Sequence, residues 1–197
     1  ATLNPETGWL AWTPGFNQHG EYKVPVSVIA TWTLASGDTF KTTVTRDVVF
    51  NVLNANGAPL FEPAETWNLL EGQPLRISAF AFDPDNPEFA PKIRVHPGTQ
   101  AIGPETSAAT VTYDVQGLPA GASFDADTLE ILWTPTYSQA GTYQVTVTAI
   151  DDGNGTGAPG TSQITLPIIV SDANRAPQLG DISNAYVNKN SVIDIPV

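Results

Sequence analysis

The chain repeats part of its own sequence, and this repeat limits the possible folds more than any other feature. Residues 1–29 align with residues 122–150 without a gap, at a shift of 121 positions. Unrelated stretches of this length would share roughly two identities at an average usage of about 5–7% per residue type. Eleven pairs are identical here: Ala1/Ala122, Thr7/Thr128, Trp12/Trp133, Thr13/Thr134, Pro14/Pro135, Gln18/Gln139, Gly20/Gly141, Tyr22/Tyr143, Val24/Val145, Val26/Val147 and Ile29/Ile150. The sequence therefore contains parts of at least two similar units.

A second match fixes the period and the phase of the repeat. The segment VLNANGAPLF at 52–61 falls on VSDANRAPQL at 170–179 at a shift of 118. We therefore predict three parts: residues 1–55 as the C-terminal part of one repeat, 56–174 as a complete repeat, and 175–197 as the N-terminal strands of the next. Positions 80–121 of the unit have no counterpart at either end. We expect both ends to be fragments of a longer polypeptide or to be completed by neighbouring chains.

Short alternating runs predict the secondary structure of each unit. Apolar residues share one parity at 143–149, at 164–170 and at 44–52, with polar residues between them. Period-two alternation rich in β-branched residues is typical of strands with one buried face. Gly- and Asp-rich turns separate the runs, and no window shows helical periodicity. About seven short strands in a unit of slightly more than 100 residues predict an all-β fold of tandem β-sandwich domains.

Composition narrows the range of partners and compartments. Hydrophobic residues make up 41% of the chain, which is enough to bury a core. A net charge of −12 argues against nucleic acid and anionic membrane surfaces as partners. It favours the binding of cations to the acidic surface. The sequence has no cysteine, so it forms neither a disulfide nor a thiolate metal site. No run of 18 apolar residues is present, so we expect no membrane insertion.

Four segments of the middle unit resemble a known family. They read LLEGQPLRISAFAFDPDN at 69–86, GLPAGASFDADTLEILWTP at 117–135, AGTYQVTVTAIDDGNG at 140–155 and DANRAP at 172–177. This chain is similar to bacterial cadherin-like, immunoglobulin-type (Ig-like) tandem repeats of large extracellular proteins. The resemblance implies Ig-like/cadherin-like β-sandwiches. Residues 87–116 depart from the family's pattern and are predicted to be an insertion that carries binding specific to this unit.

The resemblance also implies a role. Such repeats are spacers or adhesive stalks of secreted or cell-surface proteins, so the implied localisation is extracellular and the implied partners are neighbouring repeats, other copies, surface proteins or glycans. Pro59 and Pro177 at the unit boundaries support a stiff rod, because proline fixes φ and restricts the residue before it. Two alternatives stay open: a carbohydrate- or protein-binding module, and an accessory domain of a secreted hydrolase.

Two tryptophans are predicted to have different roles. Trp133 shares the inward parity of Ile131, so it is expected in the core, as is Trp12 in the first unit. Trp9 aligns with Glu130 and is expected to face outward, where an exposed indole serves as a sugar platform or a contact surface unless a neighbouring unit covers it.

The sequence does not predict an enzyme. Carboxylate pairs occur at Asp83/Asp85, Asp125/Asp127 and Asp151/Asp152, but each lies in a loop within or beside a repeat motif. No nucleophile elbow, phosphate-binding loop or Ser/His/Asp set in a recognisable context is present. His19 and His96 lack a second histidine at ligand spacing, so no transition-metal site is expected.

Calcium is the cofactor that the resemblance implies. Ca²⁺ takes six to eight oxygen ligands, which Asp- and Asn-rich turns supply. In cadherin-like domains the ligands gather at the junction between units. The matching positions here are Glu71, Asp83, Asp85, Asp151, Asp172 and Asn174. The linker of the earlier junction has Asn54 and Asn56 but no acid, so the sequence predicts weaker binding there than at the later junction. The same residues also suit plain turn formation.

Overall fold

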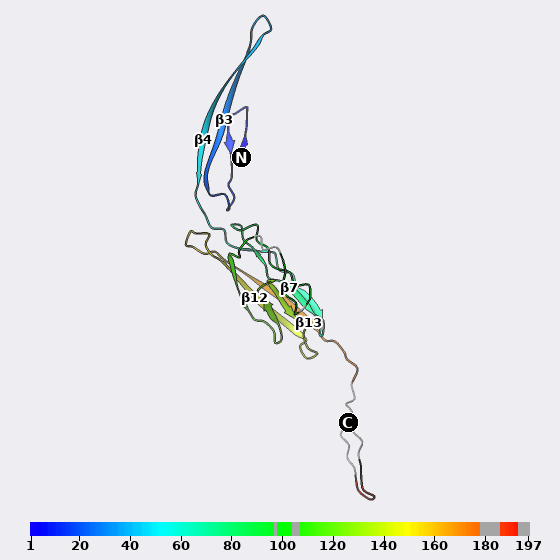
Figure 1. The fold of residues 1–197 in the computed structure, drawn as a ribbon. Helices are drawn as coiled ribbons and strands as arrows, with labels where there is room; N and C mark the ends of the chain where they lie inside the picture. Colours follow the sequence, from blue (N-terminus) through cyan, green and yellow to red (C-terminus); the bar gives the residue numbers. More distant parts are fainter. Residues whose placement is uncertain (97, 104–106, 178–185, 193–197) are drawn as a thin grey trace.

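The computed structural model describes residues 1–96, 98–103, 107–177 and 186–192. Every regular element among them is a β-strand, which confirms the all-β prediction. Figure 1 shows a long two-stranded hairpin followed by a sandwich, with the chain leaving the sandwich at the opposite end. The strands are β1 (Thr2–Leu3), β2 (Leu10–Ala11), β3 (Gly20–Thr33), β4 (Thr39–Val52), β5 (Leu60–Phe61), β6 (Trp67–Leu70), β7 (Leu75–Ser78), β8 (Ala81–Phe82), β9 (Val111–Gln116), β10 (Ser123–Asp125), β11 (Glu130–Trp133), β12 (Gly141–Asp151) and β13 (Thr161–Ser171).

The sandwich is built from two main sheets. One has the order β6-β13-β12-β9, in which β13 and β12 are antiparallel and β6 joins β13 in parallel. The other has the order β10-β11-β7, and the short pair β5-β8 lies beside them in the fold. Because side chains alternate between the two faces of a strand, the period-two runs of the sequence place one apolar row between the sheets.

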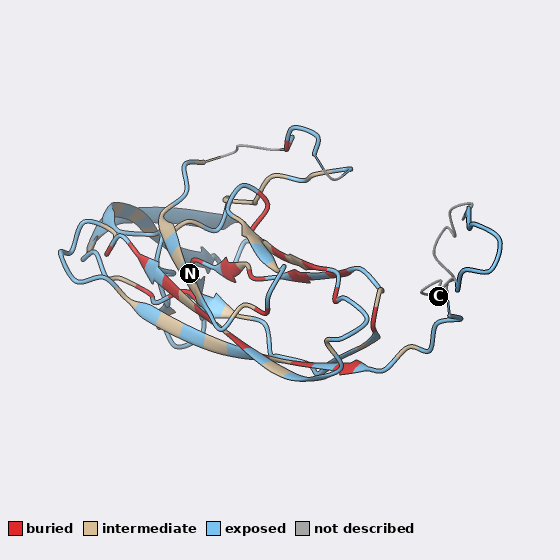
Figure 2. Cartoon of the chain, turned by 90° about the horizontal axis from the view of Figure 1, so that it is seen from below, coloured by how far each residue is buried: buried red, intermediate tan, exposed pale blue. Residues whose placement is uncertain are grey.

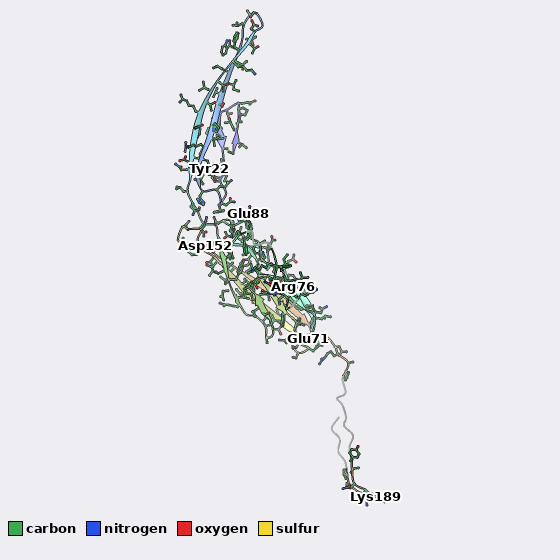
Figure 3. The ribbon with its side chains drawn as sticks, in the orientation of Figure 1. Tyr22, Glu71, Arg76, Glu88, Asp152 and Lys189 are labelled. Atoms are coloured by element: carbon green, nitrogen blue, oxygen red, sulfur yellow. The ribbon has the colours of Figure 1, made fainter. Side chains whose placement is uncertain are left out.

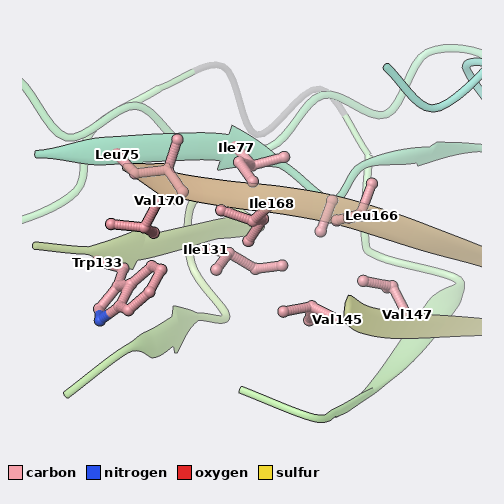
Figure 4. Packing of buried hydrophobic residues seen from close by; sticks show 10 residues of the cluster. Leu75, Ile77, Ile131, Trp133, Val145, Val147, Leu166, Ile168 and Val170 are labelled. Carbon is pink, nitrogen blue, oxygen red and sulfur yellow. The ribbon is translucent and has the colours of Figure 1, made fainter. Parts of the chain in front are cut away.

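That apolar row forms the core. Val145, Val147 and Ala149 of β12 are each 0% exposed, and so is Ile168 of the neighbouring strand β13. Trp133 is 3% exposed, which confirms its predicted place in the core. Figure 2 shows the buried residues along the facing strands, and Figure 4 shows how the side chains of the two sheets interdigitate.

The first unit has the same strand pattern but no comparable core. β3 and β4 pair along their whole length, from Gly20–Val52 to Thr33–Thr39, and β1 and β2 form a separate small pair. Trp12 meets Tyr22 and Phe50 edge-on, at centroid distances of 4.8 and 5.9 Å. Farther along the hairpin, the prediction of one buried face is wrong: Val44 is 56% exposed, because no second sheet formed by the described residues covers it.

The described residues of the stretch 87–110 contain little regular structure apart from the bridge between Ile93 and Ile102. Arg94 ties this stretch to the sandwich through Asp125 of β10, at 2.8 Å from Nε to Oδ2. The Asp125 partner is the first cause of the raised pKa of the Arg94 guanidinium, and burial opposes it. Whether residues 87–116 are an insertion with a binding role stays a prediction. Among the described residues, no helix is long and apolar enough to cross a membrane.

Candidate junction site

Polar side chains from three segments meet where the hairpin joins the sandwich. The linker 53–59 leads from β4 into β5, and β5 pairs with β8 so that Leu60 lies opposite Phe82. Asp83 and Asp85 follow directly after β8, and Asp151 is the last residue of β12. The linker therefore passes beside both acidic turns. Figure 3 shows this end of the sandwich at Asp152, next to Asp151.

Asp151 is the buried anchor of this site. Asp151 is only 5% exposed. Asn56 Nδ2 donates to both of its carboxylate oxygens, at 2.9 and 3.1 Å, and the backbone N–H groups of Gly153 and Gly160 each donate at 2.8 Å. A Cβ on Gly160 would lie 2.6 Å from Asp151 Oδ2, so only glycine allows this approach. The linker is thus held to a carboxylate that the sandwich itself positions.

Asp85 and Asn154 make a second connection. Gly57 N–H donates to Asp85 Oδ2 at 2.7 Å, and Asn154 Nδ2 donates to Asp85 Oδ1 at 2.8 Å. Asn154 Nδ2 also reaches Asn54 Oδ1 at 3.0 Å, while Asn54 Nδ2 donates to the Asn154 carbonyl. Asn154 adopts a left-handed φ of 47°, a conformation that asparagine tolerates better than most residues. The β12–β13 loop therefore binds the linker through the Asn154 side chain and through the backbone carbonyls of Asn154 and Ala158.

Negative charge accumulates at this junction. Asp83 accepts hydrogen bonds from Asp85 N–H and from Thr110 Oγ1. The donors to Asp83, Asp85 and Asp151 are amides, backbone N–H groups and one hydroxyl, none of which is positively charged. Burial raises the pKa of Asp85, and the charges of Asp83 and Asp151 raise it further, against the hydrogen bond from Gly57. The three carboxylates are thus partly desolvated and repel one another.

The donor set fits calcium in its chemistry. Carboxylate, amide and carbonyl oxygens are the ligands that Ca²⁺ takes, and Asn56 Oδ1 is a buried oxygen without a hydrogen-bond partner. However, every carboxylate oxygen of the three acids already accepts a protein hydrogen bond. Within the described residues, no group of three or more His, Cys, Asp or Glu side chains is placed to hold a metal ion. An ion would therefore have to displace some of these donors.

The remaining predicted ligands lie at the opposite end of the sandwich, near Glu71 in Figure 3. Glu71 is 4% exposed and accepts backbone N–H bonds from Gln139 at 2.8 Å, Ala140 at 2.7 Å and Ala173 at 3.2 Å. Burial raises the pKa of Glu71, but hydrogen bonds from the three backbone N–H groups and with the Asp172 side chain together lower the pKa overall. Asp172 and Asn174 are exposed on the chain leaving this end.

The structure therefore divides the six predicted ligands into two groups, Asp83, Asp85 and Asp151 at one end, and Glu71, Asp172 and Asn174 at the other. The expectation that the earlier junction contains no acid considered only its linker, and the sandwich supplies three. Sequence reasoning missed Asn154 and Thr110 as members of the site. The alternation of turn residues in DDGNG could have indicated Asn154, whereas nothing near Thr110 in sequence pointed to Asp83.

Trp9 lies outside both groups. It is 77% exposed, as its parity predicted, and ends a turn in which Asn4 N–H donates to the Trp9 carbonyl at 2.9 Å. Its predicted role as a contact surface is not tested by this geometry and stays a prediction.

Comparison with known proteins gives one match at the level of families. Residues 83–167 match a family model described as Putative Ig domain. No curated protein matches the chain.

Several solved structures are similar in fold. Mouse cadherin-23 repeats EC22–24 share 21% identity at a TM-score of 0.42, over 78% of this chain and 43% of that chain. Drosophila N-cadherin EC1–4 shares 22% identity at 0.37, over 75% and 32%. An endo-fucoidan hydrolase of glycoside hydrolase family 107 shares 12% identity at 0.39, over 79% and 27%. This chain thus spans less than half of each structure.

Proposed function

We propose that this chain, whose middle is an Ig-like, cadherin-like domain, is a structural or adhesive spacer of a large bacterial extracellular protein. It would hold successive units end to end and carry no catalytic site. The observation that supports this role is the junction network. Asn56 joins the linker to Asp151, Gly57 joins it to Asp85, and Asn54 accepts a hydrogen bond from Asn154. The linker that follows the hairpin is therefore fixed to the sandwich by several hydrogen bonds, two of them partly buried, and is not a free tether. Shared polar contacts of this kind restrict bending at the joint.

Distance measurements between spin labels test this proposal. The chain has no cysteine, so Thr43→Cys on β4 and Thr165→Cys on β13 place one label on each part. We expect a narrow distance distribution for the parent and a broad one for Asn56→Ala. Asn51→Ala, an exposed asparagine of β4, is the matched control and should leave the distribution narrow. Equally broad distributions for all three proteins would rule out a stiff joint.

Calcium is the finer part of the proposal. Asp83, Asp85 and Asp151 would hold the ion together with the side-chain oxygen of Asn56, and the ion would neutralise acids that now repel one another. Extracellular sites of this type bind at about 10⁻⁴–10⁻³ M. With calcium at about ten times that constant, folding would gain roughly 1.4 kcal/mol. Scanning calorimetry in several millimolar Ca²⁺ against a chelator measures this gain. An unchanged melting temperature would end the calcium proposal and leave the spacer role intact.

A contact role for Trp9 is the second candidate, because this residue of the first unit is 77% exposed. The test is a glycan array and a pull-down with extracellular proteins, comparing the parent with Trp9→Ala. A ligand that survives the substitution would assign binding elsewhere, for example to the pocket of about 380 Å³ that Arg94 lines together with Arg76 and Leu132.

A further inference from the structure

One face of the β3–β4 hairpin is mostly apolar, and much of it is exposed. On this hairpin face, paired residues lie directly opposite each other, including Val24 with Val48, Val28 with Val44, and Trp32 with Phe40. Val28 is 68% exposed and Trp32 48%, although Trp32 stacks on Phe40 at 5.9 Å. Contiguous apolar surface of this kind marks an interaction site in a soluble protein.

The same chain shows what covers such a face. Val24, Val26 and Val28 match Val145, Val147 and Ala149 at the shift of 121 positions, and the latter three are each 0% exposed. The short strands β1 and β2 likewise match β10 and β11. In the middle unit, β9 pairs with the free side of β12, β6 pairs in parallel with the free side of β13, and β7 adds to β11. All three strands come from residues 57–121: β9 and β6 extend the sheet of β12 and β13, and β7 extends the sheet that lies across from it.

Charge adds a second criterion for the partner. Arg46 lies opposite Val26, and Ile164 lies opposite Val147, so Arg46 occupies the place that Ile164 takes in the sandwich. Ile164 lines a cavity of about 290 Å³ together with Glu62 and Glu65. A segment patterned like residues 57–121 would therefore bring carboxylates to the lone cation of the hairpin face.

We infer that the hairpin face binds a polypeptide half-unit with the pattern of residues 57–121, which completes a second sandwich. A strand like β9 adds antiparallel to β3, a strand like β6 adds parallel to β4, and the apolar row of the partner covers Val24, Val26 and Val28. Backbone hydrogen bonds along the two open strand edges supply affinity, and the alternate side chains supply specificity. This surface is separate from the junction and goes beyond the spacer role.

The first test adds a fragment of residues 57–121 to the full chain. We expect a 1:1 complex with a negative heat-capacity change, and slower hydrogen exchange in 20–33 and 39–52. Val28→Asp should weaken binding at least roughly tenfold, because it buries an unpaired charge. The matched control is Ile29→Asp, on the opposite face of β3. Arg46→Glu should also weaken binding, and the fragment with Glu62→Lys and Glu65→Lys should restore it.

A second variant covers the case in which the fragment does not stay soluble. A copy of residues 57–121 is joined directly ahead of Ala1, which reproduces the spacing of the middle unit. The fused chain should protect β3 and β4 from exchange, and Val28→Asp should remove that protection. Exchange as fast as in the parent would overturn the inference. Dimerisation of the parent alone, abolished by Val28→Asp, would also overturn it by assigning the hairpin face to a second copy.

Discussion

Replacing Trp133 with alanine should be among the most damaging single changes in this chain. The side chain is 3% exposed, its indole N–H donates to the Ala120 carbonyl at 3.2 Å, and its ring meets Tyr143 edge-on at 4.9 Å. Truncation of a buried aromatic residue costs roughly 3–5 kcal/mol. We expect the upper half of that range, because the ring contact and the hydrogen bond are lost with the buried surface. Domains are held by about 5–15 kcal/mol, so the sandwich would be close to unfolding.

The internal repeat supplies the control for this experiment. Trp12 occupies the matching position and makes the matching contact with Tyr22, but it is only partly buried. Trp12→Ala should therefore cost less, roughly 1–3 kcal/mol. Urea denaturation followed by far-UV circular dichroism measures both free energies of unfolding. Equal losses of unfolding free energy in the two variants, or a Trp133→Ala chain as stable as the parent, would refute the argument that burial under a second sheet makes Trp133 more stabilising than Trp12.

Two other predictions concern the ends of the sandwich. Asn56→Ala removes the side-chain donor to the buried Asp151 carboxylate and should lower the free energy of unfolding by roughly 1–3 kcal/mol in urea, whereas Asn51→Ala should change little. The lowered pKa of Glu71 means that its stabilising contribution is present above the ordinary value of 4.5 and is lost as the pH falls through the lower folded-state pKa. The melting temperature of the parent should then fall more on acidification from neutral pH than that of Glu71→Gln. Equal falls in melting temperature for the two proteins would contradict this assignment.

The fold could be predicted from sequence because it rests on local patterns. The alternation of apolar and polar residues in β12 and β13 determines which face of each strand points into the core, since here each strand buries only one of its two faces. The inward parity of Val145 and Ile168 and the outward parity of Trp9 followed from spacing alone. The same reasoning failed for Val44, because parity tells which face is apolar and does not tell whether a second sheet covers it.

The junction was harder to predict because its members are distant in sequence. Asn56 lies 95 positions from Asp151, and Asn154 lies 69 positions from Asp85. Each residue alone reads as a turn former. Only the pairing of β5 with β8 and the course of β12 bring them to one edge. Linker composition was therefore a poor measure of the charge at either junction.

Calcium, if it binds, should act at the first junction, which reverses the ranking that the linkers suggested. Arg175 follows Asn174 at the later junction, and its guanidinium lies 4.3 Å from the centre of the Tyr137 ring. The positive charge of Arg175 repels a calcium ion at that junction and so weakens its binding there. At the first junction the matching contact is between Gly57 and Phe16, and the nearby carboxylates have no cationic donor.

Two substitutions, Asp85→Asn and Asp172→Asn, tell which of the two junctions binds calcium. Burial and the charges of Asp83 and Asp151 raise the pKa of Asp85, so Asp85→Asn removes a repulsion at neutral pH, but it also removes the acceptor of the Asn154 amide. The two effects oppose each other, and Asp85→Asn in chelator should melt close to the parent. In several millimolar Ca²⁺ the parent should melt higher than in chelator, Asp172→Asn should show the same gain, and Asp85→Asn should show none. A calcium gain lost in Asp172→Asn but kept in Asp85→Asn would place the ion at the later junction and refute the charge argument.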